Sequence, residues 1–277
     1  MRQVTRRRDY QGLFEEFLTL YRERPFQSNS GGMGMPHMFA AWVFLREAEP
    51  ELVVESGVWK GQGTWLIERA TKANIVSIDL VPAFCEYHSP RATYSDIDFA
   101  HMDWSKAPKA QTVLFFDDHV NQFRRLMQGR AWGFGNFIFE DNYPAGFGDT
   151  PSLRQMRAGA YDGLGPSRKP RGIGWRGAVR RVVLPRIARV QILAERYDPD
   201  ALGRALATMD LDYEEFPPLR TFSKTRWGTD WRAAYGDIPG CLKLETLSAE
   251  ALALIEAEGR SYTSICNVRA VAAQDAD

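Results

Sequence analysis

The segment ELVVESGVWKGQGTWLIERA, residues 51 to 70, decides the fold. It opens with a short apolar run, passes through a turn that contains Gly57, Gly61 and Gly63, and continues with a pattern typical of a helix. Glycine lets the backbone approach a ligand closely, and the first N–H groups of a helix are free to bind one. Because doubly wound sheets bind nucleotides at such a turn, we expect a cofactor at Gly57 and Gly61.

Acidic residues around this turn indicate which ligand it would bind. Glu55 lies two residues before Gly57, where its charge would repel a pyrophosphate but attract a cationic amino or sulfonium group. Asp79 ends the second apolar run, the position from which an acid holds ribose hydroxyls, with an ordinary cap as the alternative. Asp103, on the next loop, would either face an adenine ring or cap the surface. No Tyr is followed four residues later by Lys, so the catalytic pair of short-chain dehydrogenases is missing.

The rest of the chain repeats the alternation of apolar runs and helix-like segments. Apolar runs typical of strands occupy residues 52–55, 74–79, 113–117 and 136–140, with later candidates at 211–216 and 262–271. Helical spacing of apolar residues marks residues 10–24, the segment after Pro36, and residues 248–259. Short apolar strands that alternate with helices predict an α/β fold: a doubly wound, mostly parallel sheet with helices on both faces.

Composition limits the class of protein. The chain has 277 residues, of which 44% are hydrophobic and 25% charged, as in ordinary globular proteins. Lys plus Arg equal Asp plus Glu at 35 each, which gives no reason to expect nucleic acid as a partner. Three dispersed cysteines fit reduced thiols better than disulfides or a zinc site. We find no secretory signal and no membrane-spanning window, and we expect a cytoplasmic protein.

Two apolar runs end in adjacent acids. In FFDDHVNQ, residues 115–122, the apolar run is followed by Asp117 and Asp118. In FIFEDNYP, residues 137–144, it is followed by Glu140 and Asp141. Carboxylates gathered at one edge of a sheet repel one another unless a cation lies between them. Oxygen ligands suit Mg²⁺, and the few Cys and His residues argue against zinc. The alternative is that these acids cap the helices that follow.

Four motifs carry a resemblance to a known family. ESGVWKGQGT, VSIDL, FFDDHVN and FIFEDNYP, in this order and spacing, resemble the class I S-adenosylmethionine-dependent methyltransferases. The likeness is strongest to the branch with cephalosporin hydroxylase and the rhamnosyl and macrocin O-methyltransferases, and it covers roughly residues 30 to 145. It implies a Rossmann-like sheet with an antiparallel last strand, S-adenosylmethionine as the methyl donor, and a divalent cation.

The resemblance also implies roles for the acids. Asp117, Glu140 and Asp141 match the metal-binding acids of that branch, although Asp118 takes the first place if the loop is one residue shorter. A vicinal diol of a sugar, glycan or other small-molecule acceptor would bind the cation, which lowers the pKa of the attacking hydroxyl. His119 follows the acids and is the candidate general base, with an ordinary structural histidine as the alternative.

Other interpretations and the organisation of the chain stay open. The motif DID, residues 96–98, allows a metal-dependent nucleotide-sugar enzyme, and a non-catalytic methyltransferase-like binding domain is a further alternative.

Residues 1–48 are expected to form a helical cap and residues 49–277 the methyltransferase domain, with an Arg- and Gly-rich insertion or lid at about 145–190. The arginines of this insertion would either bind an anionic acceptor or form a solvated helix face. The apolar residues of the N-terminal helix would either form the interface of a homo-oligomer or complete the core of the monomer.

Overall fold

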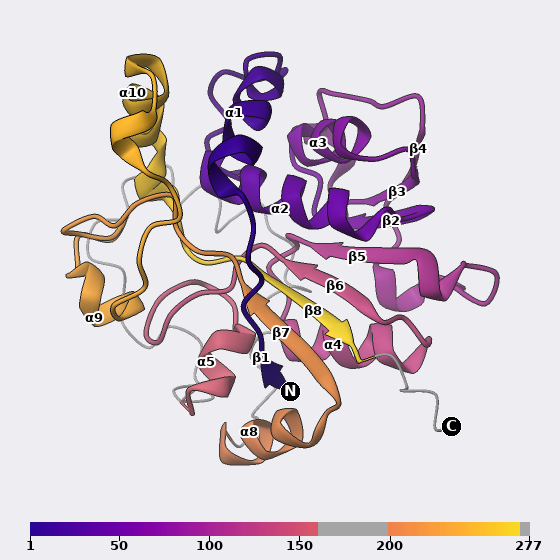
Figure 1. Cartoon of the computed structure of the whole chain (residues 1–277). Coiled ribbons are helices and arrows are strands. Elements are labelled where there is room, and N and C mark those ends of the chain that lie inside the picture. The colour runs from indigo at the N-terminus through magenta and orange to yellow at the C-terminus, as the bar shows by residue number, and fades with distance from the viewer. Residues whose placement is uncertain (160–198, 272–277) are drawn as a thin grey trace, which may run out of the picture.

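The computed structural model describes residues 1–159 and 199–271, and a single sheet runs through this part of the chain (Figure 1). Its strand order is β1-β7-β8-β6-β5-β2-β3-β4. The strands are β1 (Arg2–Gln3), β2 (Leu52–Ser56), β3 (Asn74–Ile78), β4 (Ala92–Ser95), β5 (Thr112–Phe116), β6 (Asn136–Phe139), β7 (Leu211–Glu215) and β8 (Cys266–Ala270).

All neighbouring strands pair in parallel except at β8. β8 is antiparallel to both β6 and β7, so the last strand of the chain is inserted with its direction reversed. β2 lies at the centre, between β3 and β5, and its last residue, Ser56, is in register with Ile78 and Phe116. The predicted fold class, a doubly wound Rossmann-like sheet with an antiparallel last strand, is confirmed.

Helices cover both faces of this sheet (Figure 1). One face carries α1 (Tyr10–Tyr21), α2 (Met35–Ala48), α3 (Gln62–Ala70) and α10 (Ala249–Glu258). The other carries α4 (Gln122–Ala131), α5 (Leu153–Arg157) and α8 (Pro199–Thr208), while the short α9 (Trp231–Tyr235) joins a separate aromatic cluster. Each face therefore has its own hydrophobic core, which is why the strands read as nearly continuous apolar runs.

The two-residue period of the strands decides where the acids go. Phe115 packs into the core on the α2 side, and Phe116 packs into the opposite core. Because side chains alternate along a strand, the residues that follow are directed in turn: Asp117 to the side of α2 and Asp118 to the side of α4. The same alternation after β6 places Glu140 on the side of α2.

Helix α2 is buried along most of its length. It begins at Met35, with Pro36 in its first turn, so His37 lies within the helix. Phe39 and Phe44 are fully buried. Because α2 packs in one core with the sheet, the predicted cap is continuous with the rest of this hydrophobic core.

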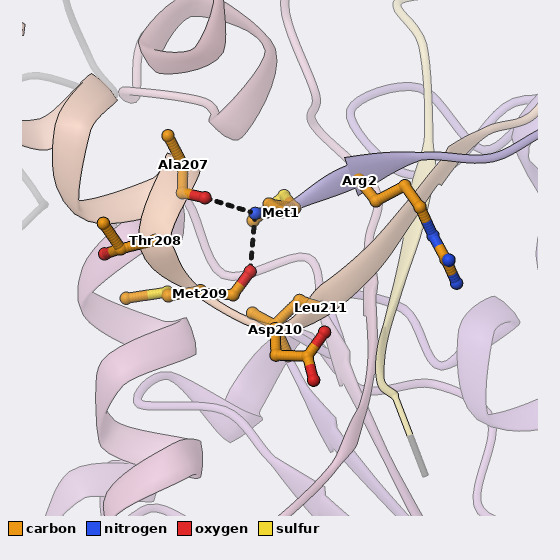
Figure 2. Close-up of a pocket in the computed structure, with 7 residues that line it drawn as sticks. All are labelled: Met1, Arg2, Ala207, Thr208, Met209, Asp210 and Leu211. Atoms are coloured by element: carbon orange, nitrogen blue, oxygen red, sulfur yellow. Dashed lines mark hydrogen bonds between the residues drawn. The ribbon is translucent and has the colours of Figure 1, made fainter. Parts of the chain in front are cut away.

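The strands β1 and β4 are absent from the prediction. β1 is two residues long, and its neighbour Met1 donates hydrogen bonds from the N-terminal ammonium to carbonyl groups at the end of α8 (Figure 2). A positive charge at a helix C-terminus is favourable. These contacts line a pocket at Leu211, the first residue of β7, and so at the amino ends of the parallel strands.

The predicted insertion and the predicted division into domains are not tested by these elements. Most of the predicted insertion at 145–190 lies outside the described residues, and its arginines are therefore not placed. The division into a cap and a methyltransferase domain stays a prediction. Among the helices of the described residues, none combines the length and apolar character that crossing a membrane requires.

Candidate functional site

The glycine turn after β2 lies against the loop after β5. Gly57 has a φ of 95°, and a Cβ added there would collide with the carbonyl group of Asp117. Gly61, with a φ of 93°, caps the start of α3, and its Cβ would collide with the carbonyl group of Tyr87. Only glycine satisfies both the backbone angle and the close approach. The turn thus brings the predicted cofactor region into contact with the first predicted metal ligand.

Glu55 lies beneath this turn and is fully buried. Its Oε2 accepts hydrogen bonds from Ser77 Oγ at 2.7 Å and Thr64 Oγ1 at 2.5 Å, whereas its Oε1 has no hydrogen-bond partner. A Cβ on Gly63 would collide with that free oxygen, so Oε1 faces the first turn of α3. Burial raises the pKa of Glu55 to about 7, against the two hydroxyl donors that lower it. The group is therefore poised to ionise when a positive charge approaches.

Asp79 holds the turn in place. Its Oδ2 accepts hydrogen bonds from the backbone N–H groups of Val58 at 3.0 Å and Trp59 at 2.9 Å. Its Oδ1 accepts one from the N–H of Val81 at 2.8 Å. The carboxylate lies at the carboxyl end of β3 beside the glycine turn, where a ribose-binding acid is expected, and its contact with a ribose stays a prediction.

Exposed apolar side chains follow β3 and β4, and sequence reasoning missed them. Leu80 is 62% exposed, Ile97 52% and Phe84 48%. Leu80 lies two residues after Ile78 and Ile97 two residues after Ser95, and Ile78 and Ser95 are in register at the carboxyl ends of β3 and β4. Apolar groups exposed side by side at the carboxyl edge suit the face of a flat heterocycle. The signal in the sequence is an apolar residue directly after a strand-ending acid.

Asp103 is exposed, and its Oδ1 accepts a hydrogen bond from the backbone N–H of Ser105 at 2.9 Å. The same hydrogen bond lowers the pKa of Asp103. This is the geometry of the surface cap that the sequence left as an alternative, and the adenine contact stays a prediction.

The acids after β5 and β6 converge with a histidine. Asp117, His119 and Asp141 each offer a ligand atom, and these atoms lie within 4.8 Å of one another. Asp141 is 8% exposed, and its Oδ2 makes no hydrogen bond. Burial, followed by the charges of Glu140 and Asp141, raises the pKa of Asp117 well above its usual range. The carboxylates thus gather without enough protein charge to compensate them.

Asp118 is excluded from this cluster by Arg125 of α4. Its Oδ2 accepts hydrogen bonds from Ser56 Oγ at 2.7 Å and from Arg125 Nε at 2.8 Å. The same guanidinium makes two hydrogen bonds to Asp98, at 2.9 and 2.7 Å. Asp117 is therefore the free acid of the DD pair. Asp98, the second acid of the DID motif, is held by an arginine, which argues against a metal-binding DxD.

Glu140 is buried and has an unexpected partner, His37 of α2. Its Oε1 lies in hydrogen-bond contact with His37 Nδ1, and its backbone N–H donates to the carbonyl group of Phe116 at 3.0 Å. Burial, followed by the charge of Asp141, raises the pKa of Glu140 well above its usual range. Glu140 is thus near the acid cluster while one of its oxygens is engaged from α2. Its role as a metal ligand stays a prediction.

His119 lies between carboxylates at the open side of the cluster. Its Nδ1 is 3.1 Å from Asp149 Oδ1 and 3.2 Å from Asp141 Oδ2, and its side chain is 49% exposed. Partial burial acts to lower its pKa, but the carboxylates of Asp149, Asp141 and Asp117 outweigh it and raise the pKa well above the usual value. An imidazole at this point can either bind a cation or exchange protons with a ligand.

Strained backbone marks the same edge of the sheet. Among the described residues other than glycine, φ is positive at Trp59, His119, Ser264 and Glu49. The first two follow β2 and β5. Ser264 precedes the antiparallel β8 and accepts a hydrogen bond from the N–H of Asn142 at 3.2 Å. Such conformations cost about 1–3 kcal/mol each and concentrate at functional sites. Three of the four therefore point to the carboxyl edge.

The donor set fits a hard divalent cation. Carboxylate oxygens dominate the cluster, one buried oxygen has no hydrogen-bond partner, and His119 leaves the outer side accessible. Mg²⁺ binds to one or two carboxylates and keeps several waters, which suits such an open arrangement.

Comparison with known proteins gives distant structural likeness. No protein-family model matches the chain, and no curated protein gives a significant match. A structure of CmcI-D160 with Mg-SAM is 20% identical, covers 51% of this chain and 69% of that chain, and has a TM-score of 0.33. The O-methyltransferase TomG from Streptomyces achromogenes, in complex with SAM, is 11% identical, covers 97% and 92%, and has a TM-score of 0.43. A methyltransferase from Geobacter sulfurreducens is 16% identical, covers 50% and 76%, and has a TM-score of 0.32. At these values the likeness carries no argument about activity.

Proposed function

We propose that the chain is an S-adenosylmethionine-dependent O-methyltransferase that uses a divalent cation, with Mg²⁺ as the first candidate. Its acceptor is a hydroxyl group of a sugar, a glycan or another small molecule. The observation that carries this proposal is the contact between Gly57 and Asp117. Because the glycine turn packs against the acid-bearing loop, a donor at the turn and a cation at the acids would be neighbours.

The turn and its surroundings would hold the donor. The first N–H groups of α3 and the backbone near Gly57 offer hydrogen bonds, and Asp79 would meet the ribose after β3. Leu80 and Ile97 supply apolar surface for the adenine. The charge of Glu55 favours a cationic methionine group over a pyrophosphate.

The acids would hold the cation and the acceptor. Asp117 and Asp141 are the ligands that the geometry supports best, together with His119 or Glu140. When bound, the cation supplies Lewis-acid chemistry that lowers the pKa of the acceptor hydroxyl. Where Glu140 is the third ligand, His119 remains available as the base: it is anchored at Nδ1 by Asp149, and its Nε2, when unprotonated, would take the hydroxyl proton. The chain contributes chiefly by holding the nucleophile and the methyl group in line.

The remaining expectations form part of the same proposal. We expect a cytoplasmic enzyme with a small-molecule or glycan acceptor, no nucleic-acid or membrane partner, and room for a homo-oligomer. The balanced charge of the chain is consistent with this view.

Calorimetry tests the proposal against its alternatives. S-adenosylhomocysteine should release or absorb heat on binding, and NADH and a nucleotide sugar should not, with or without Mg²⁺. Asp79→Ala should abolish the signal, and Asp237→Ala, at an exposed ion pair, should preserve it. Binding of the nucleotide sugar but not of S-adenosylhomocysteine would overturn the proposal in favour of the nucleotide-sugar enzyme.

Turnover gives an independent test once an acceptor is identified. His119→Ala should lower the rate of methyl transfer by about 100-fold or more if His119 is the general base. A wild-type rate would reassign His119 to the structure of the loop.

A further inference from the structure

His37 lies far from the acid cluster along the chain, but its side chain is buried, and both of its ring nitrogens make hydrogen bonds. Its side chain is 2% exposed. Nε2 lies 2.9 Å from the backbone N–H of Thr263, and Nδ1 contacts Oε1 of Glu140. A backbone N–H can only donate, so Nε2 is the acceptor and carries no proton. The proton of the neutral ring is therefore on Nδ1, and it is donated to the Glu140 carboxylate.

The surroundings keep this imidazole neutral. The N–H of Thr263 occupies Nε2, so the ring cannot carry the second proton that would make it a cation. A neutral ring with one fixed tautomer is a directional hydrogen-bond donor and not a counter-ion. The contact therefore orients Glu140 but leaves its negative charge uncompensated.

Glu140 lies next to the cluster and has a second carboxylate oxygen that His37 does not contact. Glu140 follows β6 directly beside the acid that follows β5, because its N–H donates to the carbonyl group of Phe116 in the parallel neighbour at 3.0 Å, and the adjacent Asp141 belongs to the cluster. Carboxylates that bind metals are commonly fixed by hydrogen bonds from a second layer of residues. The first turn of α2, the helix that precedes β2 in the chain, supplies such a bond.

We propose that His37 is a positioning residue: its Nδ1–H fixes one oxygen of Glu140 and presents the other to a divalent cation bound at Asp117 and Asp141. This inference rests on the proposed function, because it requires the cation. It assigns to α2, which lies in the predicted N-terminal cap, a part in forming the metal site.

Two substitutions separate this role from mere packing. Asn places an amide near the position of Nδ1, whereas Gln places it near Nε2. His37→Asn thus keeps a donor for Glu140, and His37→Gln keeps only the contact with Thr263. We expect His37→Gln to weaken Mn²⁺ binding, measured by electron paramagnetic resonance, by about 10-fold or more, and His37→Asn to stay within about 3-fold of wild type. The exposed His101→Asn is the matched control.

The outcomes distinguish the proposal from the function on which it rests. S-adenosylhomocysteine affinity should be the same in all variants, and Glu140→Gln should weaken Mn²⁺ binding as His37→Gln does. Equal Mn²⁺ affinity of His37→Gln, Glu140→Gln and wild type, with loss of binding in Asp117→Asn, would overturn the role of His37 but keep the metal site. Absence of Mn²⁺ binding by the wild type would overturn both.

A measurement on the wild type protects the test if the variants do not fold. In ¹⁵N-labelled protein, the His37 signals should show the Nδ1–H tautomer and should shift when Mg²⁺ is added. A His37 signal that stays unchanged while that of His119 moves would overturn the proposal.

Discussion

Glu55 carries a buried carboxyl group whose ionisation the fold resists. Its pKa is raised to about 7 by burial, so the folded chain keeps a proton that the unfolded chain loses at about pH 4.3. The stability that this difference provides is complete below that lower pH and is lost as the pH rises through about 7. Under the proposed function, this loss of stability at high pH is offset when the ionised carboxylate binds a cationic ligand.

Replacement of Glu55 tests this exchange. Glu55→Gln keeps an acceptor for Thr64 and Ser77 and removes the ionisation. At about pH 8 it should unfold with a free energy higher than that of wild type by on the order of 2–3 kcal/mol, and at about pH 4 the difference should vanish. Urea unfolding at both pH values measures it, with Glu23→Gln at an exposed site as control. A pH-independent difference would show that ionisation of Glu55 is not the cause.

The glycine turn and α4 are the elements that shape the site. Gly57 combines a positive φ with contact to the Asp117 carbonyl group, whereas Gly228 has a φ of 80° and open space around it. Gly57→Ala should therefore suffer both backbone strain and a collision, and Gly228→Ala only the strain of about 1–2 kcal/mol. S-adenosylhomocysteine affinity should fall by about 10-fold or more for Gly57→Ala and stay unchanged for Gly228→Ala. Equal affinities in the two variants would place the donor elsewhere.

Helix α4 joins two loops through one arginine. Arg125 is buried and bridges Asp98, after β4, to Asp118, after β5. Removal of one partner from a buried ion pair costs about 3–5 kcal/mol, because the remaining charges are left without compensation. Arg125→Met should thus lower the unfolding free energy by about that amount.

Urea unfolding measures this loss, and the exposed Arg130→Met is the control. A loss below about 1 kcal/mol would mean that the ion pairs contribute no more than a surface contact.

At the scale of the whole molecule, the central strands could be read from the sequence because each is an apolar run between polar turns. β2, β3, β5, β6, β7 and β8 were all predicted within a few residues. β4 was missed because ATYS, at the edge of the sheet, is only partly buried and lacks an apolar run. β1 is too short to carry any periodicity.

The sequence predicted those parts of the site whose residues directly follow the ends of strands. The convergence of Asp117 with Asp141 follows from two parallel neighbouring strands that end in acids. The choice between Asp117 and Asp118 depends on Arg125 of α4, which binds Asp118. This contact forms only in the folded chain, so no sequence pattern predicts it. The contact between His37 and Glu140 joins residues that are 103 apart in the chain, and no local sequence pattern predicts it.

The pH dependence of the whole chain follows from these buried acids. The pKa values of Asp117 and Glu140 are raised by burial and by mutual repulsion, so these two groups keep protons in the folded chain that they lose in the unfolded chain above about pH 4. Stability should therefore fall as the pH rises through their folded pKa values. A cation that binds the ionised carboxylates should oppose this fall.

The most direct measurement is the unfolding free energy at about pH 8 with and without Mg²⁺. Mg²⁺ at about 100 times its dissociation constant should stabilise the wild type by about 2–3 kcal/mol. The stabilisation should disappear in the variant that carries Asp117→Asn and Asp141→Asn. An unfolding free energy that is the same with and without Mg²⁺ in the wild type would contradict a cation site at the carboxyl edge of this sheet.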